Sequence, residues 1–147
     1  MELLFILHVG ATLALVGLIW VVQLAVYPLY GHVAAGPFGR YHEAWCARIT
    51  WVVAPLFAFE GLGAAALVFG GAPPALAVDP KLALLGFATF VANALSTAFV
   101  QVPLHARLSR SFDPATHARL VRTNWLRTVL WTVHGGVVLA MCLTLAT

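Results

Sequence analysis

Charged side chains are scarce in this sequence, and that scarcity limits the classes of protein it can form. Only 9% of its 147 residues are Asp, Glu, Lys or Arg, whereas 62% are hydrophobic. The mean hydropathy of +0.94 is far above that of an ordinary soluble domain. The net charge of +3 comes from so few groups that nucleic acid is not an expected partner. We therefore expect lipid as the solvent and the bilayer as the first partner.

Cysteine is also scarce, and the short motifs of common metal sites are missing. The two cysteines, Cys46 and Cys142, form no CxxC pair, and the six histidines form no HxxxH or HExxH pattern. We expect the cysteines to lie near opposite faces of the membrane, where both pack and neither forms a disulfide. His32 and His117 fall in connecting segments and are expected to be solvated. The sequence has no visible internal repeat, so a transporter built from inverted halves has no support.

Long unbroken runs rich in Leu, Ala and Val dominate the chain and predict transmembrane helices. A helix of about 20 residues crosses a hydrocarbon core of roughly 30 Å, and the chain has room for four such helices. We predict an all-α, integral membrane four-helix bundle with up-down topology, formed by residues 1–147 as a single transmembrane domain. The predicted spans are about 3–27, 43–69, 80–105 and 121–145.

Proline and aspartate separate the predicted spans. Pro28 cannot continue the backbone hydrogen-bond ladder, so we expect the first span to end at Tyr27. Two Asp-Pro pairs each put a capping carboxylate directly before a proline at the first helical position, which predicts helix starts there. These pairs are Asp79-Pro80 and Asp113-Pro114. The last helix is therefore longer than the bilayer requires, and its first turns are expected to project from the membrane.

The positive charges predict the orientation of the bundle. Seven of the eight Lys and Arg residues fall on one side of the membrane in this arrangement, and only Lys81 falls on the other. Under the positive-inside rule the basic side is cytoplasmic. We therefore expect a multi-pass protein of the bacterial inner (plasma) membrane, with both termini on the non-cytoplasmic side.

Polar residues recur on every predicted helix at steps close to three or four, so each helix carries one polar stripe. Polar groups inside hydrocarbon are costly unless paired, and we expect the four stripes to face each other. They predict a polar-lined pocket open toward the cytoplasmic side; plain helix–helix packing, at about 1 kcal/mol per hydrogen bond, is the alternative. The stripes are His8, Thr12, Gln23 and Tyr27; Arg48, Pro55 and Glu60; Asn93, Thr97, Gln101 and His105; and Asn124, Arg127, Thr128, Trp131 and His134.

The denser group of polar residues lies near the cytoplasmic ends of the helices and is predicted to bind a cofactor or substrate. Arg48 and Arg127, if they faced one space, would repel each other unless an anion such as a carboxylate, propionate or phosphate lay between them. Snorkelling of both side chains to the lipid headgroups explains them equally well. The group comprises Gln23, Tyr27, Tyr41, His42, Arg48, Gln101, His105, Asn124 and Arg127.

A second group lies near the middle of the membrane. Glu60 and His134 are expected to form a hydrogen bond there, with His8 one or two turns further out. The pair is either structural or used for proton transfer or metal ligation. We favour a functional role, because apolar residues would fill these places at lower cost. The candidate metal ligands are His8, His42 and His105, and these three and His134 are the candidate haem ligands.

Parts of the chain resemble known membrane proteins. The opening LHVGATLALVGLIWVVQLAVYP and the stretch ARITWVVAPLFAFEG are similar to the first two helices of HemJ-type protoporphyrinogen oxidases and of anthrone-oxygenase-like membrane proteins. The segments YHEAWCARIT, QVPLH and NWLRT resemble a family of small bacterial four-helix membrane proteins. In the HemJ-type family the first-helix histidine is implicated in haem binding. The resemblance therefore implies His8 as a haem ligand and haem b as the cofactor.

Taken together, the polar stripes and this resemblance predict a membrane-embedded oxidoreductase or haem-binding redox protein. Arg48 and Arg127 would hold an anionic group of the cofactor or substrate, while Glu60, His134 and Tyr41 would be the catalytic residues that handle protons. One alternative is a binding or transport module for an anionic or amphipathic small molecule. Another is a non-catalytic assembly subunit whose polar stripes only pack helices. A homo-oligomer is compatible with all three.

Overall fold

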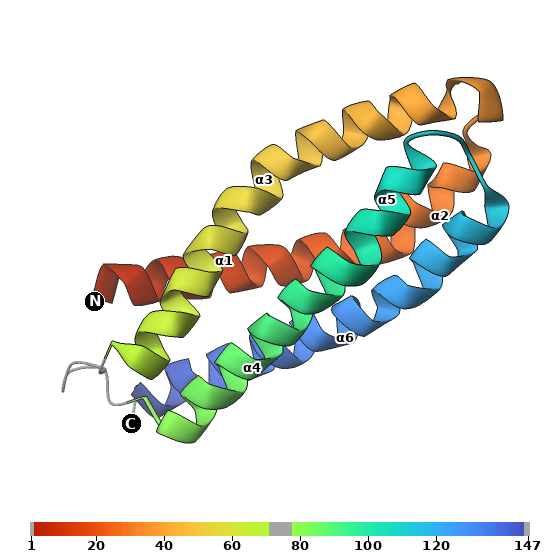
Figure 1. Ribbon diagram of the computed structural model, residues 1–147. Coiled ribbons are helices and arrows are strands. Elements are labelled where there is room, and N and C mark those ends of the chain that lie inside the picture. The colour runs from red at the N-terminus through yellow and green to blue at the C-terminus, as the bar shows by residue number, and fades with distance from the viewer. Residues whose placement is uncertain (1, 71–77, 146–147) are drawn as a thin grey trace.

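The computed structural model describes residues 2–70 and 78–145, which form four long helical arms packed side by side (Figure 1). The first arm consists of α1 (Glu2–Val21), the π-helical η1 (Val22–Val26), α2 (Tyr27–Leu29) and the 3-10 helix η2 (Tyr30–His32). The second arm is α3 (Ala35–Phe69). The third consists of α4 (Pro80–Ser96), the π-helical η3 (Thr97–Gln101) and α5 (Val102–Leu108), and the fourth is α6 (Pro114–Leu145).

The arms run alternately up and down. The start of α1, the end of α3, the start of α4 and the end of α6 lie at one end of the bundle, and the connections that follow η2 and α5 lie at the other (Figure 1). All regular structure in the described residues is helical. The prediction of an all-α, up-down arrangement of four helices is therefore confirmed.

Three helix boundaries differ from those predicted. The first arm continues through Pro28 to His32, so the predicted end at Tyr27 is wrong. The second arm begins at Ala35 rather than near residue 43, and the third continues to Leu108 rather than 105. The fourth runs unbroken from Pro114, as predicted. The boundary at Pro28 was wrong because the helix accommodates this proline instead of ending at it.

A π-helical segment precedes two of the prolines and explains how the helix continues. η1 ends at Val26, two residues before Pro28, and η3 ends at Gln101, two residues before Pro103. Proline has no N–H group, and its ring clashes with the carbonyl four residues earlier. The wider π turn changes the hydrogen-bond register just before the ring, which relieves that clash. Each π segment also contains one buried glutamine, Gln23 in η1 and Gln101 in η3.

Aspartate caps begin the third and fourth arms, as the Asp-Pro pairs predicted. The carboxylate of Asp79 accepts a hydrogen bond from the Lys81 backbone N–H at 2.8 Å. The carboxylate of Asp113 accepts from the Thr116 backbone N–H at 2.8 Å and also from the Thr116 hydroxyl. These hydrogen bonds from Thr116 hold the pKa of Asp113 below its ordinary value.

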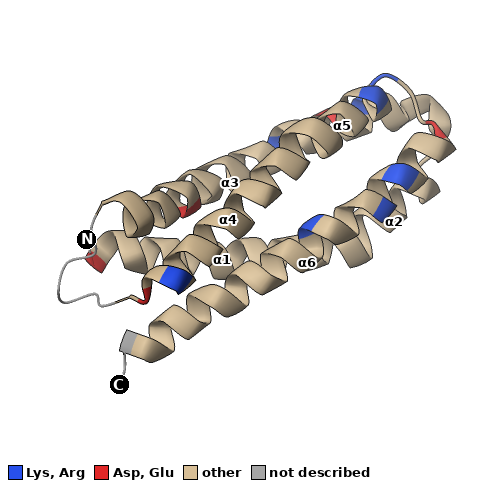
Figure 2. Ribbon diagram, turned by 60° about the horizontal axis from the view of Figure 1, so that its bottom comes forward, with Lys and Arg blue, Asp and Glu red and all other residues tan. Residues whose placement is uncertain are grey.

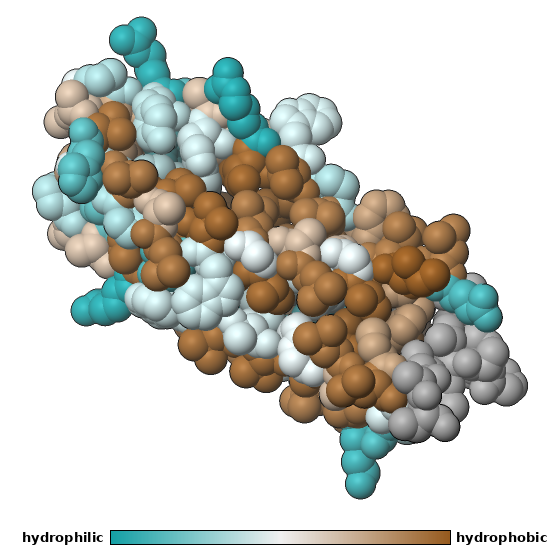
Figure 3. Space-filling model, turned by 180° about the vertical axis from the view of Figure 1, so that it is seen from behind, coloured by the Kyte–Doolittle hydropathy of each residue, from teal (hydrophilic) through white to brown (hydrophobic). Residues whose placement is uncertain are grey.

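The outer surface of the bundle is apolar over its middle. Trp51 and Phe99 are 85% and 75% exposed, and many Leu and Val side chains on all four arms are also exposed. Apolar side chains dominate the middle of the view in Figure 3, and Figure 2 shows most Lys and Arg gathered toward the end where α2 and α5 lie. All four arms are long and apolar enough to cross a membrane. This surface is consistent with a membrane protein whose arms face lipid.

Three apolar clusters fill the interior, one toward each end of the bundle and one between them. Tyr30 and Phe38 belong to the cluster at the basic end, and Met141 to the cluster at the opposite end. Leu15 and Trp131 belong to the middle cluster. Polar side chains are buried between these clusters, and they form the two groups described next.

Candidate functional site

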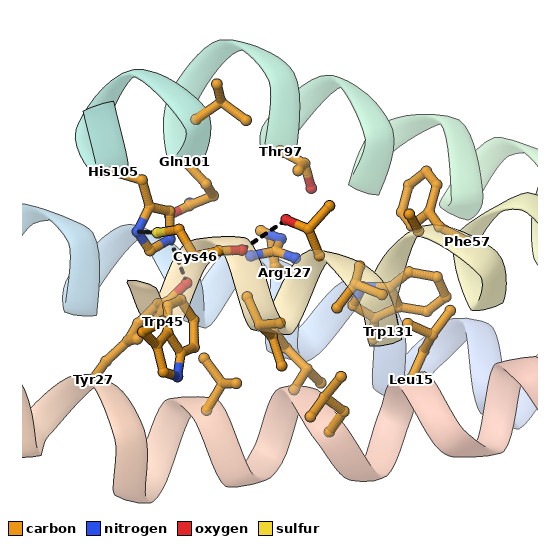
Figure 4. Close-up of a pocket in the computed structure, with 18 of the residues that line it drawn as sticks. Leu15, Tyr27, Trp45, Cys46, Phe57, Thr97, Gln101, His105, Arg127 and Trp131 are labelled. Carbon is orange, nitrogen blue, oxygen red and sulfur yellow. Dashed lines mark hydrogen bonds between the residues drawn. The ribbon is translucent and has the colours of Figure 1, made fainter. Parts of the chain in front are cut away.

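A cavity of about 710 Å³ lies between the arms on the basic side of the middle cluster. Its wall is largely apolar, with Leu15 and Ile19 on α1 and Val53 and Phe57 on α3. Polar side chains gather toward the end near α5, and Trp131 lies toward the opposite end (Figure 4). The polar lining residues labelled in Figure 4 are Tyr27, Cys46, Thr97, Gln101, His105 and Arg127. The size suits a small organic ligand, and the wall favours a ligand with an apolar body.

The cavity opens on the side of the bundle. The exposed residues of its lining belong mainly to two arms: Thr50, Ala54 and Ala58 on α3, and Val102 and Ala106 on α5. An opening between α3 and α5 would face lipid in a bilayer. An amphipathic molecule could then enter from the membrane without crossing water, whereas the polar stripes had predicted an opening toward the cytoplasmic side.

A chain of hydrogen bonds runs from the cavity toward the basic end. The Tyr27 hydroxyl lies 2.8 Å from Nε2 of His105, and Nδ1 of His105 lies 3.0 Å from Nε2 of His42. Nδ1 of His42 lies 2.8 Å from the Ser109 hydroxyl. With both rings neutral, the hydrogens can point either all toward Ser109 or all toward Tyr27, depending on the tautomers. We call these four residues the histidine chain, and their arrangement is that of a proton relay.

Cys46 and Trp45 lie beside the histidine chain. Cys46 was expected only to pack, yet its Sγ lies 3.8 Å from Nδ1 of both His42 and His105. These three residues could hold a metal ion. The ring of Trp45 stacks on His105 with centroids 5.8 Å apart. Both cysteines are free, as predicted.

Arg127 and Gln101 line the cavity, and each has one buried polar atom without a partner. Arg127 donates from Nη1 to Oδ1 of Asn124 at 3.0 Å, and Asn124 donates from Nδ2 to Oε1 of Gln23 at 2.8 Å. Gln101 donates from Nε2 to the Thr123 hydroxyl at 3.3 Å. Within the described residues, Nε of Arg127 and Oε1 of Gln101 have no hydrogen-bond partner. Nε of Arg127 is a hydrogen-bond donor and Oε1 of Gln101 is an acceptor, so together they suit a ligand that has both an acceptor and a donor.

A second buried polar group, the central cluster, lies on the other side of Trp131 and consists of His8, Thr12, Glu60, Thr89 and His134. His134 Nε2 is hydrogen-bonded to Oε1 of Glu60, so the predicted pair is confirmed. Nδ1 of His8 lies 3.2 Å from the same oxygen, although it is not aligned for a hydrogen bond. The Thr12 hydroxyl lies 2.5 Å from Oε2 of Glu60, and the Thr89 hydroxyl lies 2.8 Å from Nδ1 of His134. These five residues come from all four arms and are all buried.

Trp131 separates the cavity from the central cluster. Its ring lines the cavity, and its edge-to-face contact with the His134 ring has a centroid distance of 5.5 Å. His8, Glu60 and His134 do not line the cavity. The bundle therefore holds two sites, which the sequence had separated by depth.

Tyr41 and Arg48 belong to neither site. Arg48 is exposed and donates to the Ala44 carbonyl of its own helix at 3.4 Å, so the expectation that it faces Arg127 is wrong. Tyr41 is 45% exposed and packs against the rings of Tyr30 and Phe38. An α-helix turns about 100° per residue, which puts Arg48 about 120° and Tyr41 about 100° away from Glu60. Both side chains therefore point away from the bundle interior.

His117 was expected in solvent, but it is half-buried and connects two arms. Its Nε2 lies 2.7 Å from the backbone carbonyl of Tyr27. A carbonyl only accepts, so Nε2 of His117 is the protonated nitrogen and donates this hydrogen bond. The contact fixes the start of α6 against α2, next to the histidine chain.

The position of His8 determines whether it could ligate a haem in the cavity. His8 is enclosed in the central cluster and its ring packs against Gly63, where no room remains even for a methyl group. His8 is therefore not placed to ligate a group in the cavity. Of the four histidines considered, only His105 lines the cavity, and a haem there would be held by His105, with Arg127 beside its propionates.

Comparison of the chain with protein-family models, with curated proteins and with solved structures found no match. The function has to be inferred from the geometry of the two sites.

Proposed function

We propose that the protein is a membrane-embedded oxidoreductase whose cavity binds an amphipathic, lipid-soluble carrier of the quinone class. The observation that carries this proposal is that two residues lining one largely apolar cavity, Arg127 and Gln101, each keep a buried polar atom without a partner, a donor on Arg127 and an acceptor on Gln101. A quinone carbonyl accepts from the guanidinium, and a quinol hydroxyl donates to the amide oxygen. The apolar body of the ligand lies against Leu15 and Phe57 and enters between α3 and α5.

The histidine chain supplies the protons that this chemistry requires. Reduction of a quinone to a quinol consumes two electrons and two protons, and the electrons come from a separate reduced carrier protein. For each proton, the Tyr27 hydroxyl donates to the ligand oxygen and is reprotonated from Nε2 of His105. His105 is reprotonated at Nδ1 from His42, and His42 from Ser109, which takes a proton from water at the basic end. Each passage leaves both rings in the opposite tautomer, so both must return to the starting tautomer before the second proton follows. The hydrogen-bond distances of 2.8, 3.0 and 2.8 Å suit each transfer.

The orientation in the membrane belongs to the same proposal. Most Lys and Arg residues lie near the α2 and α5 end of the bundle, to which the histidine chain leads (Figure 2). By the positive-inside rule this end faces the cytoplasm and both termini face away from it. In a bacterial inner membrane the relay would then take its protons from the cytoplasm.

Ligand binding tests the proposal directly. Trp45 and Trp131 line the cavity, so a short-chain benzoquinone added to the purified protein in nanodiscs should quench tryptophan fluorescence saturably. Arg127→Gln removes a charge-assisted hydrogen bond of about 1.5–3 kcal/mol, so its Kd should rise about 10-fold to 100-fold. Arg48→Gln removes the same charge from an exposed position on α3 and should leave the Kd unchanged.

Two results would count against a quinone site. Equal Kd values for Arg127→Gln, Arg48→Gln and the unsubstituted protein would show that the quinone binds elsewhere. Saturable binding of a fatty acid with no binding of the quinone would favour a binding or transport module for an anionic amphipathic molecule.

A haem-binding protein is the second candidate, because His105 and Arg127 line the same cavity. A Soret absorption band in the purified protein that persists in His8→Phe and disappears in His105→Phe would support it. If the band instead depended on His8, the assignment of the haem ligand to His105 would be wrong.

A further inference from the structure

We propose that the central cluster is a metal site, in which His8, Glu60 and His134 bind one divalent first-row transition-metal ion. One ligand atom from each residue lies within 4.8 Å of the others, and all three side chains are buried. Two imidazoles and one carboxylate are a common protein ligand set for zinc and for ferrous iron. This site is separate from the cavity, so the proposal does not depend on quinone binding.

The hydrogen bonds of Thr89 favour one tautomer of His134, and in that tautomer Nε2 is the nitrogen that can bind a cation. The Thr89 hydroxyl has one hydrogen and lies 2.8 Å from the Gly86 carbonyl and 3.0 Å from the Leu85 carbonyl, both of which can only accept it. The Thr89 oxygen is then free to accept from Nδ1–H of His134, 2.8 Å away. Nε2 of His134 is left with a lone pair that points at the carboxylate of Glu60. Two such acceptors in contact require a cation between them.

A metal ion satisfies this cluster better than a proton does. A proton shared by His134 and Glu60 would leave Nδ1 of His8 without a partner, because this atom lies 3.2 Å from Oε1 of Glu60 but is not aligned for a hydrogen bond. An unpaired polar atom in such a buried place is costly. One metal ion would use the lone pairs of all three residues at once.

The residues around these three ligands hold them in position by hydrogen bonds and packing, as the residues around the ligands of metal sites do. Thr89 holds the His134 ring through its other nitrogen, and Thr12 holds the second oxygen of Glu60 at 2.5 Å. Such outer contacts orient the ligands and set their tautomers. Gly63 allows α3 to approach His8, since a Cβ there would lie 2.5 Å from Cβ of His8. The three ligands are thus brought together by residues on all four arms.

The ligand spacing is close to that of an occupied site. Bonds to zinc of about 2.0–2.2 Å in a tetrahedron separate ligand atoms by about 3.3–3.5 Å. Nδ1 of His8 and Oε1 of Glu60 are 3.2 Å apart, whereas His134 and Glu60 are closer and must separate when the ion enters. The ligands belong to α1, α3 and α6, so the bound ion would link three arms. The bound ion is therefore expected to stabilise the association of these three helices.

Metal content and thermal unfolding test the proposal. The full-length protein in nanodiscs, stripped with a chelator and then titrated with Zn²⁺, should bind one equivalent at the central cluster, and its Tm should rise as the ion binds the folded state. Glu60→Gln and His8→Phe should lose that equivalent. His42→Phe alters the other histidine group and should retain it. Mass spectrometry of the bound metal and calorimetry give the stoichiometry and the Kd.

Thr89→Val provides a second test if a variant of one of the three ligands fails to fold. It keeps all three ligands but removes the support of His134, so the Kd for Zn²⁺ should rise about 10-fold to 100-fold. Three results would overturn the proposal. The first is that the unsubstituted protein binds no stoichiometric Zn²⁺ and its Tm does not change. The second is an unchanged Kd for Zn²⁺ in Thr89→Val. The third is that His42→Phe loses the ion and Glu60→Gln keeps it. The first would mean that a proton alone holds the cluster together.

Discussion

The close approach of α1 and α3 at Gly63 predicts the effect of one added methyl group. In Gly63→Ala the new Cβ would lie 2.5 Å from Cβ of His8 and 2.7 Å from its Cγ. Non-bonded carbon atoms prefer about 3.5–4.0 Å, so the two helices must separate by about 1 Å or His8 must leave its position. Overpacking of this kind costs about 1–3 kcal/mol, and alanine returns about 0.5–1 kcal/mol of helix propensity. The difference is about 0–2.5 kcal/mol, and contacts as short as 2.5 Å put Gly63→Ala in the upper part of this range, at about 1–2 kcal/mol.

Thermal unfolding in nanodiscs measures this effect against a matched variant. A loss of about 1–2 kcal/mol should lower the Tm by roughly 2–8 °C for a chain of this size. Gly10 lies on α1, and a methyl group added there would meet no atom within 4 Å, so Gly10→Ala should not lower the Tm. If Gly63→Ala were as stable as Gly10→Ala, α1 and α3 would not approach each other as described, and the geometry of the central cluster would be wrong.

Two further variants test the hydrogen bonds that position the arms. Gln23→Leu leaves the buried Nδ2 of Asn124 without its acceptor. The free energy of unfolding, measured by denaturant titration, should fall by about 1–3 kcal/mol. A smaller fall would mean that the contact is not made. Asp113→Ala should lower the Tm near neutral pH. Hydrogen bonds from Thr116 depress the pKa of Asp113 below 3.8, so the stability it contributes is present above that pH and is lost as pH falls through the lower folded pKa. A Tm difference that persisted in strong acid would contradict this.

The polar stripes predicted much of the interior because helix periodicity is a local property of the sequence. Polar residues three or four positions apart share a helix face, and hydrocarbon leaves those faces no better place than the bundle interior. The pairing of Glu60 with His134 followed from depth alone. His42 and Cys46 lie 18 and 14 residues before Glu60, within about 40° of it around an α-helix. That arithmetic could have placed Cys46 in the site, and it would have excluded Arg48.

Other features could not be predicted because they depend on contacts between arms or on alternatives to the α-helix. A proline usually marks a helix end, and the first arm continues through Pro28 with a π turn directly before it. Arg127 and Arg48 both lie near the cytoplasmic end of a predicted span, so the sequence does not distinguish them. In the structure, Asn124 on the same helix holds Arg127 inward. The supporting role of Thr89 depends on where α4 meets α6, which periodicity does not specify.

Protection of the native cysteines gives the most direct test of the cavity as the ligand site. Cys46 lines the cavity, whereas Cys142 lies near the opposite end of the bundle, and both are free and half-buried. N-ethylmaleimide labelling followed by mass spectrometry measures both thiols in one sample. A saturating short-chain benzoquinone should slow the labelling of Cys46 several-fold and leave that of Cys142 unchanged. Equal labelling of Cys46 with and without the quinone would contradict binding in this cavity.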